Sequence, residues 1–365
     1  MRFITSFLCC LAVLAGCSSG EPIKLGYLGG LSGRVADLGE AGRNGVQLAV
    51  DQVNAAGGVG GRQVDLIIQD DGQDSQKAQA AIDAFVAAGV RTVIGPMTST
   101  MAIAILDRSK EAGLLLISPT VTASTLSGRD DNLFKVVSST QKHAQLSADS
   151  QFDQGTRRIA AVYDLGNSAY TEDWLQQFRK AFEARGGKFV AAESFKSGVD
   201  VSYGTAISKL LGSEADMLHF VASATDTVRL LQLARANGFE QPVSAATWAA
   251  TEQLIELGGR SVEGLRLTQY FDRDDSSPAY RAFHEAYVSR YKQEPGFASV
   301  AAYDAVRAIF AAIAKQKNRE SLKSALLTAG PYEGIQGSWQ FDPYGDAERD
   351  AWVTVVRSGR FARAN

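Results

Sequence analysis

The chain has little cysteine, and none of it lies beyond the first 17 residues. The three cysteines among 365 residues are Cys9, Cys10 and Cys17. A protein cleaved before Cys17 would keep a single thiol, at its first residue. A disulfide framework, thiol catalysis and a cysteine metal site are therefore excluded for the domain that follows. A domain of this size has a core large enough to fold without covalent crosslinks.

The sequence also lacks basic excess and a catalytic signature. Lys and Arg number 37 against 40 Asp and Glu, a formal net charge of −3, which argues against nucleic acid as a partner. His143, His219 and His284 are isolated, without the spacing of zinc ligands. No Gly-x-Ser-x-Gly elbow occurs, and the glycine-rich stretch 57–61 follows a predicted helix, so it is no dinucleotide loop. We expect no metal, no cofactor and no enzymatic activity.

The first 17 residues have the pattern of a lipoprotein signal peptide. A basic start precedes an apolar run over residues 3–14, which is too short for a bilayer span of about 20 residues and is typical of a cleaved signal. Leu14-Ala15-Gly16-Cys17 matches a lipobox. We expect residues 1–16 to be removed, Cys17 to carry lipid and residues up to 22 to form a spacer. The alternative is an ordinary secretory signal ending near a cysteine. No later segment is expected to span a membrane.

Strand-length apolar runs alternate with Ala-rich helical stretches along the rest of the chain. This alternation predicts βαβ units and parallel sheets. One series starts at residue 23 and a second near residue 140, each about as long as one doubly wound domain. We therefore predict an α/β fold of two Rossmann-like lobes. The tail is too short for a third domain, so the chain is expected to cross between lobes more than once.

The expected elements follow this alternation. Strands are expected at 23–28, 64–69, 91–94, 114–117, 134–137, 159–164, 189–195, 217–221, 243–247, 265–271 and 352–357, the last closing the chain. Helices are expected at 41–56, 75–88, 100–112, 141–152, 171–185, 203–211, 227–237, 279–291 and 299–314.

Polar residues just after strands are the candidate ligand contacts, because ligands of open parallel sheets bind beyond the carboxyl ends of the strands. Ser99 opens a helix after strand 91–94, where free N–H groups and the helix dipole favour a carboxylate and the Thr98 and Ser99 hydroxyls are further donors. Its alternative role is only that of an N-cap. Ser118, Thr120 and Thr122 form a hydroxyl-rich turn after the next strand, or else a proline-containing turn with incidental hydroxyls.

The second series offers fewer candidates. Tyr170 can cover a ligand or stack on a cation, or be a packing tyrosine. Asp226, three residues after Ser223, can contact a ligand or cap the next helix. Trp248 can line a cleft or pack in the second lobe.

The acidic run Asp70-Asp71-Gly72-Gln73-Asp74, in the first series, lacks EF-hand spacing and is more typical of a strand end and a helix cap.

Six short segments share an order and spacing that, taken together, are specific. They are Gly30–Gly33, Asn44–Ala49, Asn54–Arg62, Ile94-Gly95-Pro96 with Ser99, Ile117–Pro119 and Ala302–Ala305. From about Ile23 to Phe361 the chain resembles the leucine/isoleucine/valine-binding protein family, the type I periplasmic solute-binding proteins of ABC transporters. The resemblance implies two lobes joined by three crossovers, comprising residues 23–139 with 273–345 and residues 140–272 with 346–365.

The resemblance also implies a ligand site in the cleft between the lobes. Ser99 and Thr122 match residues that hold the ligand's α-carboxylate, and Ser118 and Thr120 flank that loop. Tyr170 matches an aromatic residue over the ligand. The second-lobe positions that complete an amino-acid site fall near Ser223 and Thr247.

One departure from the family pattern concerns the ligand's ammonium group. Amino-acid binders commonly place an acid near Thr247, whereas this chain has Ala245-Ala246-Thr247-Trp248-Ala249. A buried ammonium without a carboxylate is costly, so either Asp226 replaces the acid or the ligand is not an α-amino acid. The resemblance then implies an amide, an aromatic acid or another small carboxylate. The expected function is that of an exported, anchored lipoprotein that closes on its ligand and serves an ABC permease. A ligand sensor and an enzyme on the same scaffold are the alternatives.

Overall fold

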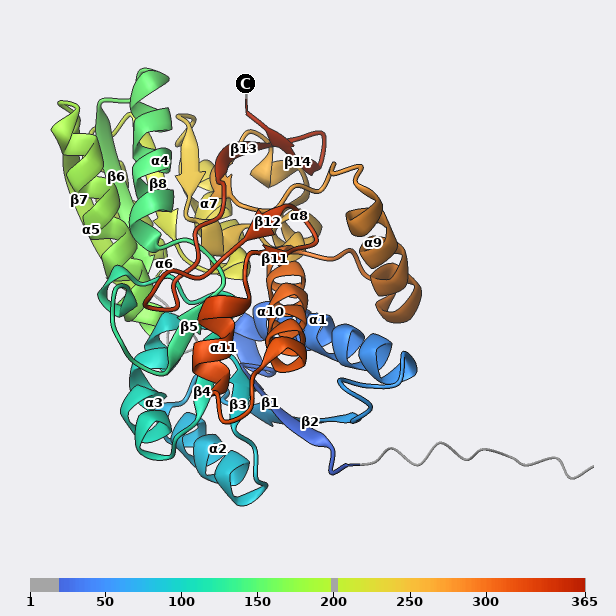
Figure 1. Cartoon of the computed structure of the whole chain (residues 1–365). Coiled ribbons are helices and arrows are strands. Elements are labelled where there is room, and N and C mark those ends of the chain that lie inside the picture. The colour runs from blue at the N-terminus through green and yellow to red at the C-terminus, as the bar shows by residue number, and fades with distance from the viewer. Residues whose placement is uncertain (1–19, 198–202, 365) are drawn as a thin grey trace, which may run out of the picture.

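Two β-sheets, each covered by helices on both faces, form two lobes (Figure 1). The computed structural model describes residues 20–197 and 203–364. The expected signal peptide and Cys17 lie outside the described residues. The predicted α/β fold of two Rossmann-like lobes is confirmed.

The first lobe is built on a parallel sheet of strand order β2-β1-β3-β4-β5. α1 and α10 cover one face of this sheet, and α2 and α3 cover the other. The strands are β1 (Ile23–Gly29), β2 (Val64–Asp70), β3 (Thr92–Ile94), β4 (Leu115–Ser118) and β5 (Leu133–Lys135). The helices are α1 (Ala36–Ala55), α2 (Ser75–Ala87), α3 (Ser99–Glu111) and α10 (Phe297–Lys315).

The second lobe has the strand order β14-β13-β10-β9-β8-β6-β7, in which only β13 runs antiparallel to its neighbours. α4 and α5 pack on one face, and α6, α7 and α8 lie on the other. The strands are β6 (Arg158–Asp164), β7 (Lys188–Phe195), β8 (Met217–Val221), β9 (Val243–Ala245), β10 (Arg266–Gln269), β13 (Trp352–Arg357) and β14 (Arg360–Arg363). The helices are α4 (Thr140–Asp153), α5 (Ser168–Ala184), α6 (Tyr203–Leu211), α7 (Ala224–Ala236) and α8 (Glu252–Gly258).

The chain passes between the two lobes three times, after β5, after β10 and before β13. The return segment adds α9 (Pro278–Tyr291), α10 and α11 (Leu322–Ala329) to the first lobe, followed by the hairpin of β11 (Tyr332–Glu333) and β12 (Ser338–Trp339). In Figure 1 this orange segment lies beside the blue α1, while the red β13 and β14 end the chain in the other lobe. The expected crossovers are thus confirmed.

α10 corrects the expectation that no later segment would look like a membrane span. Its length and its mean hydropathy of 1.5 would allow it to cross a bilayer. However, 78 % of its most apolar 18-residue stretch is buried inside the molecule. It packs against α1, where a Cβ atom on Gly45 would lie 2.2 Å from the Ser299 carbonyl oxygen. α10 is therefore a core helix, and its apolar surface is covered by protein.

Several element boundaries differ from the predicted ones. α1 begins at Ala36, because a short 3₁₀ turn at Gly33–Val35 leads directly into it. Asp74 caps α2 by accepting hydrogen bonds from the Gln76 and Lys77 backbone N–H groups, as the strand-end and cap interpretation of that acidic run predicted. The expectation that Ser75 is the N-cap is wrong, because Ser75 is the first helical residue. α8, α11, the β11–β12 hairpin and β14 were not predicted, so the expectation that strand 352–357 closes the chain is wrong.

Candidate ligand-binding site

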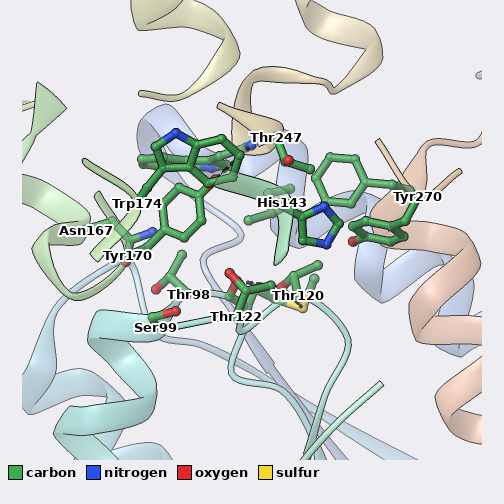
Figure 2. Close-up of a pocket in the computed structure, with 14 residues that line it drawn as sticks. Thr98, Ser99, Thr120, Thr122, His143, Asn167, Tyr170, Trp174, Thr247 and Tyr270 are labelled. Carbon is green, nitrogen blue, oxygen red and sulfur yellow. Dashed lines mark hydrogen bonds between the residues drawn. The ribbon is translucent and has the colours of Figure 1, made fainter. Parts of the chain in front are cut away.

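A pocket lies between the two lobes at the carboxyl ends of their strands (Figure 2). It contains about 440 Å³ of space not filled by protein atoms, a volume that includes its open side. The lining residues come from loops and helices of both lobes. They are Leu38, Met97, Thr98, Ser99, Thr120, Thr122, His143, Asn167, Tyr170, Trp174, Thr247, Trp248, Tyr270 and Phe297.

Seven of the ten candidate ligand contacts line this pocket: Thr98, Ser99, Thr120, Thr122, Tyr170, Thr247 and Trp248. Ser118, Ser223 and Asp226 do not. Each of these three is engaged elsewhere, as described below, and their contact with a ligand stays a prediction that the geometry does not favour.

The first lobe contributes hydroxyl groups on two adjacent loops. Thr98 occupies the N-cap position of α3, so Ser99 is its first helical residue and not the N-cap. The Ser99 hydroxyl accepts a hydrogen bond from the Ala123 N–H at 3.3 Å, and Thr120 Oγ1 donates to the Met97 carbonyl at 2.6 Å. These bonds tie the loop after β3 to the loop after β4, which fixes the first turn of α3 beside the hydroxyls.

Ser118 stabilises the turn after β4 but does not itself line the pocket. It is fully buried, and its hydroxyl donates to the Pro96 carbonyl at 2.7 Å. The same oxygen accepts from the Val121 N–H at 3.0 Å. Ser118 therefore shapes the turn that presents Thr120 and Thr122, with its own hydroxyl already used.

The second lobe contributes aromatic rings. Tyr170 and Trp174 lie one turn apart on α5, with ring centroids 5.8 Å apart, and Tyr170 meets Trp248 edge to face at 6.0 Å. The Tyr170 hydroxyl accepts a hydrogen bond from the Trp248 backbone N–H at 3.3 Å. Burial raises the pKa of Tyr170. Trp174 donates its indole N–H to His219 Nε2 at 2.8 Å. Both Tyr170 and Trp248 pack in the second lobe and line the pocket, and contact of Tyr170 with a ligand stays a prediction.

None of the described residues that line the pocket is an Asp, Glu, Lys or Arg. Burial lowers the pKa of His143 to about 4, so this side chain is neutral at pH 7. Asp226 accepts instead from the Ser197 and Ser223 hydroxyls, at 2.8 and 3.0 Å, and pairs with Arg34. Ser223, not Asp226, caps α7. The site thus offers hydroxyls, a helix N-terminus and aromatic faces.

Seven lining residues were not predicted: Leu38, Met97, His143, Asn167, Trp174, Tyr270 and Phe297. Asn167 lies in a loop that the strand-end rule had already selected, so inspection of every polar residue there would have found it. His143 and Trp174 lie inside helices, where only the tertiary fold shows which face meets the pocket.

Direct bonds between the lobes flank the pocket. The Thr100 N–H donates to Asn167 Oδ1, and its hydroxyl accepts from the Ala169 N–H, both at 3.2 Å. Thr251 Oγ1 donates to Asp37 Oδ2 at 2.7 Å. The structure therefore shows the lobes in contact around the pocket, as in a closed conformation.

Comparison with known proteins agrees with this architecture. A family model described as periplasmic binding protein matches residues 22–360. The leucine-, isoleucine-, valine-, threonine- and alanine-binding protein of Pseudomonas aeruginosa is 27 % identical over 90 % of this chain and 88 % of its own. The Leu/Ile/Val-binding protein of Escherichia coli is 25 % identical over 92 % of this chain and 93 % of its own.

Solved structures show the same fold. The branched-chain amino acid transporter substrate-binding protein LivJ of Streptococcus pneumoniae, in complex with isoleucine, superposes with a TM-score of 0.85 at 25 % identity, covering 93 % of this chain and 97 % of that one. A solute-binding protein of R. palustris in complex with benzoate gives a TM-score of 0.84 at 19 % identity, covering 94 % and 95 %. The chain therefore belongs to the periplasmic binding protein family, the solute-binding family of the leucine/isoleucine/valine-binding proteins of ABC transporters.

Proposed function

We propose that this protein is the substrate-binding component of an ABC importer and binds a small carboxylate between its lobes. The observation that carries this proposal is the pocket itself, where the first turn of α3, with Ser99, faces the aromatic rings of the other lobe. The N–H groups of a first helical turn have no intrahelical acceptor and, with the helix dipole, favour an anion. The carboxylate docks at Ser99 and Thr122, and Tyr170 and Trp248 then close over it.

The charges around the pocket favour a carboxylate without an ammonium group. A buried ammonium needs a carboxylate partner, and none lines the pocket in the part of the chain that the structure describes. Asp226, the substitute considered from the sequence, has the guanidinium of Arg34 as its counter-charge. Among relatives with named ligands, isoleucine represents the amino acids and benzoate the simple acids. We infer that this ligand belongs to the second class.

A thermal-shift screen tests the function. Purified protein is heated with amino acids, amides, aromatic acids and aliphatic acids, because a ligand that binds only the folded state raises the Tm. We expect stabilisation by one or more simple carboxylates, confirmed by calorimetry and by recovery of unchanged ligand. Stabilisation by L-leucine but not by 4-methylpentanoate, which lacks the ammonium, would contradict the ligand class. A response to no carboxylate at all would contradict the function.

We also propose that the protein is exported, anchored through a lipid on Cys17, and divided into lobes of residues 23–139 with 273–345 and 140–272 with 346–365. The lipobox at residues 14–17 supports the anchor, and the family supports export. Mass spectrometry of the protein from membranes should find an acylated first residue at Cys17. Cleavage elsewhere with an unmodified Cys17 would remove the anchor and leave the binding function intact.

A further inference from the structure

His143 is a buried polar group of the pocket wall that lacks a partner. Its side chain lies in the first turn of α4 and is 1 % exposed. Neither Nδ1 nor Nε2 has a hydrogen-bond partner among the described residues. A neutral imidazole carries one donor and one acceptor, and leaving both unpaired in a buried site is costly. The imidazole can therefore form a hydrogen bond with a ligand that enters the pocket.

The other fully buried histidine shows what this fold does with a structural imidazole. His219 Nε2 accepts from the Trp174 indole N–H, and its Nδ1 lies 2.8 Å from Ser244 Oγ. Both nitrogens of that ring are thus used. His143 differs because neither nitrogen forms a hydrogen bond with a described residue, although its ring packs against that of Tyr270 with centroids 5.6 Å apart.

The serine and threonine hydroxyls that line the pocket are bonded as well. Thr122 Oγ1 accepts from Thr140 Oγ1 at 2.9 Å, and Thr247 Oγ1 lies 2.8 Å from Thr268 Oγ1. Thr98 Oγ1 donates to Gln73 Oε1 at 3.0 Å. The His143 ring, in contrast, has no hydrogen-bond partner among the described residues. A ligand in the pocket is therefore expected to supply the missing hydrogen bond.

The position of His143 defines which part of the ligand it meets. Figure 2 shows the imidazole on the Tyr270 side of the pocket, whereas Ser99 and Asn167 lie on the other side. A ligand whose carboxylate docks at Ser99 therefore has its far end beside His143. No charged side chain of the described lining could balance a second charge there, so the group that meets His143 is uncharged.

We propose that His143 determines specificity by hydrogen-bonding an uncharged polar group, a hydroxyl, carbonyl or carboxamide, at the far end of a small carboxylate. This inference rests on the proposed function, because it assumes that the carboxylate docks at Ser99. It adds a requirement that the ligand carry a second polar group, and it assigns that group a partner on α4.

Two matched pairs of acids test the proposal by calorimetry at pH 7. The pairs are 4-hydroxybenzoate with benzoate, and 4-oxopentanoate with pentanoate. We expect the wild type to bind the polar member of at least one pair about tenfold or more tightly than its apolar partner. In His143→Leu this preference should fall to within about twofold, while the apolar member binds as well as before. His143→Asn, which keeps a donor and an acceptor, should recover part of the preference.

The control and the contradicting outcomes separate this inference from the function. His284→Leu removes a histidine on the outer helix α9 and should leave both preferences unchanged. If the acids bind but the preference is absent, or is the same in His143→Leu, buried water satisfies the imidazole and only this inference fails. If the wild type binds none of these acids or any other carboxylate, the proposed function fails with it. Unweakened binding of the apolar members shows that the variant is folded.

Discussion

Arg34 and Asp226 form an ion pair that joins the two lobes. Arg34 follows β1 in the first lobe, and Asp226 lies in the first turn of α7 in the second. The Asp226 side chain is fully buried, whereas that of Arg34 is 27 % exposed. The Tyr203 hydroxyl bonds to both partners. Separation of the lobes would break this ion pair, so the pair favours the closed conformation.

Replacement of Arg34 should weaken ligand binding through this closure. In Arg34→Ala the carboxylate of Asp226 loses its counter-charge only in the closed form, which costs about 1–2 kcal/mol after allowing for the partial exposure of Arg34, or roughly 5- to 30-fold in Kd. Calorimetry with the acid found by screening measures the change. Arg108→Ala breaks an exposed pair with Asp83 inside one lobe and should leave Kd unchanged. Equal effects of the two variants would show that the Arg34 pair does not act on closure.

Removal of the Ser99 hydroxyl tests the carboxylate site. Ser99→Ala should weaken binding by about 1.5–3 kcal/mol, roughly ten- to a hundredfold in Kd, because a charge-assisted hydrogen bond is lost. Ser109 is a matched control on the same helix, since it is buried and its hydroxyl donates to the Ile105 carbonyl at 2.6 Å. Ser109→Ala should bind as the wild type does. A Ser99→Ala protein with wild-type affinity would show that the carboxylate docks elsewhere.

Gly45 should be intolerant of a side chain because α1 and α10 touch there. A Cβ atom would lie 2.2 Å from the Ser299 carbonyl oxygen, so Gly45→Ala has to push two core helices apart, at a cost of about 1–3 kcal/mol or more. Gly204 is also helical, but nothing lies within 4 Å of its added Cβ. Gly204→Ala should be neutral or stabilising by about 0.5–1 kcal/mol. Urea unfolding of the two variants measures the contrast, and similar stabilities would contradict the tight packing.

Two buried histidines should make folding stability depend on pH. Burial lowers the pKa of His143 to about 4 and that of His219 to about 3. Below about pH 6.5 these histidines are protonated in the unfolded chain but stay neutral in the folded protein. The free energy of unfolding therefore falls as the pH falls from 6.5 toward 4. Each ring contributes about 1.4 kcal/mol per pH unit in the middle of this window. Urea unfolding at pH 7, 6 and 5 should show a slope that His143→Leu reduces by one ring's share. An unchanged slope would mean that His143 is protonated in the folded protein.

The alternation of strands and helices was enough to predict the architecture. Helix 203–211 and strands 217–221 and 352–357 have the predicted bounds, because each is a strongly periodic or apolar run between polar residues. Boundaries near caps were less predictable. Either Asp74 or Ser75 could have capped α2, and only the hydrogen bonds to Asp74 decide between them. Short elements such as α8 were missed because seven residues give too little periodicity.

The pocket was predictable where it depends on strand ends and unpredictable where it depends on helix faces. Ser99, Thr120 and Thr122 follow β3 and β4 directly, so the topology alone brings them together. His143 is different, because its position in α4 identifies it only as one of several residues on a partly polar helix. Its approach to Tyr270, 127 residues later in the chain, depends on how α4 packs against the sheet.

The contribution of α10 to the first lobe has a consequence for the order of folding. Its buried residues complete one face of a sheet whose strands all lie before residue 136, so α1 alone covers that face until residue 315 has been synthesised. A chain that ends before α10 exposes the apolar surface that α10 would cover, and the first lobe buries less surface than it needs to fold stably. Truncation after residue 139 should accordingly give no independently folding unit.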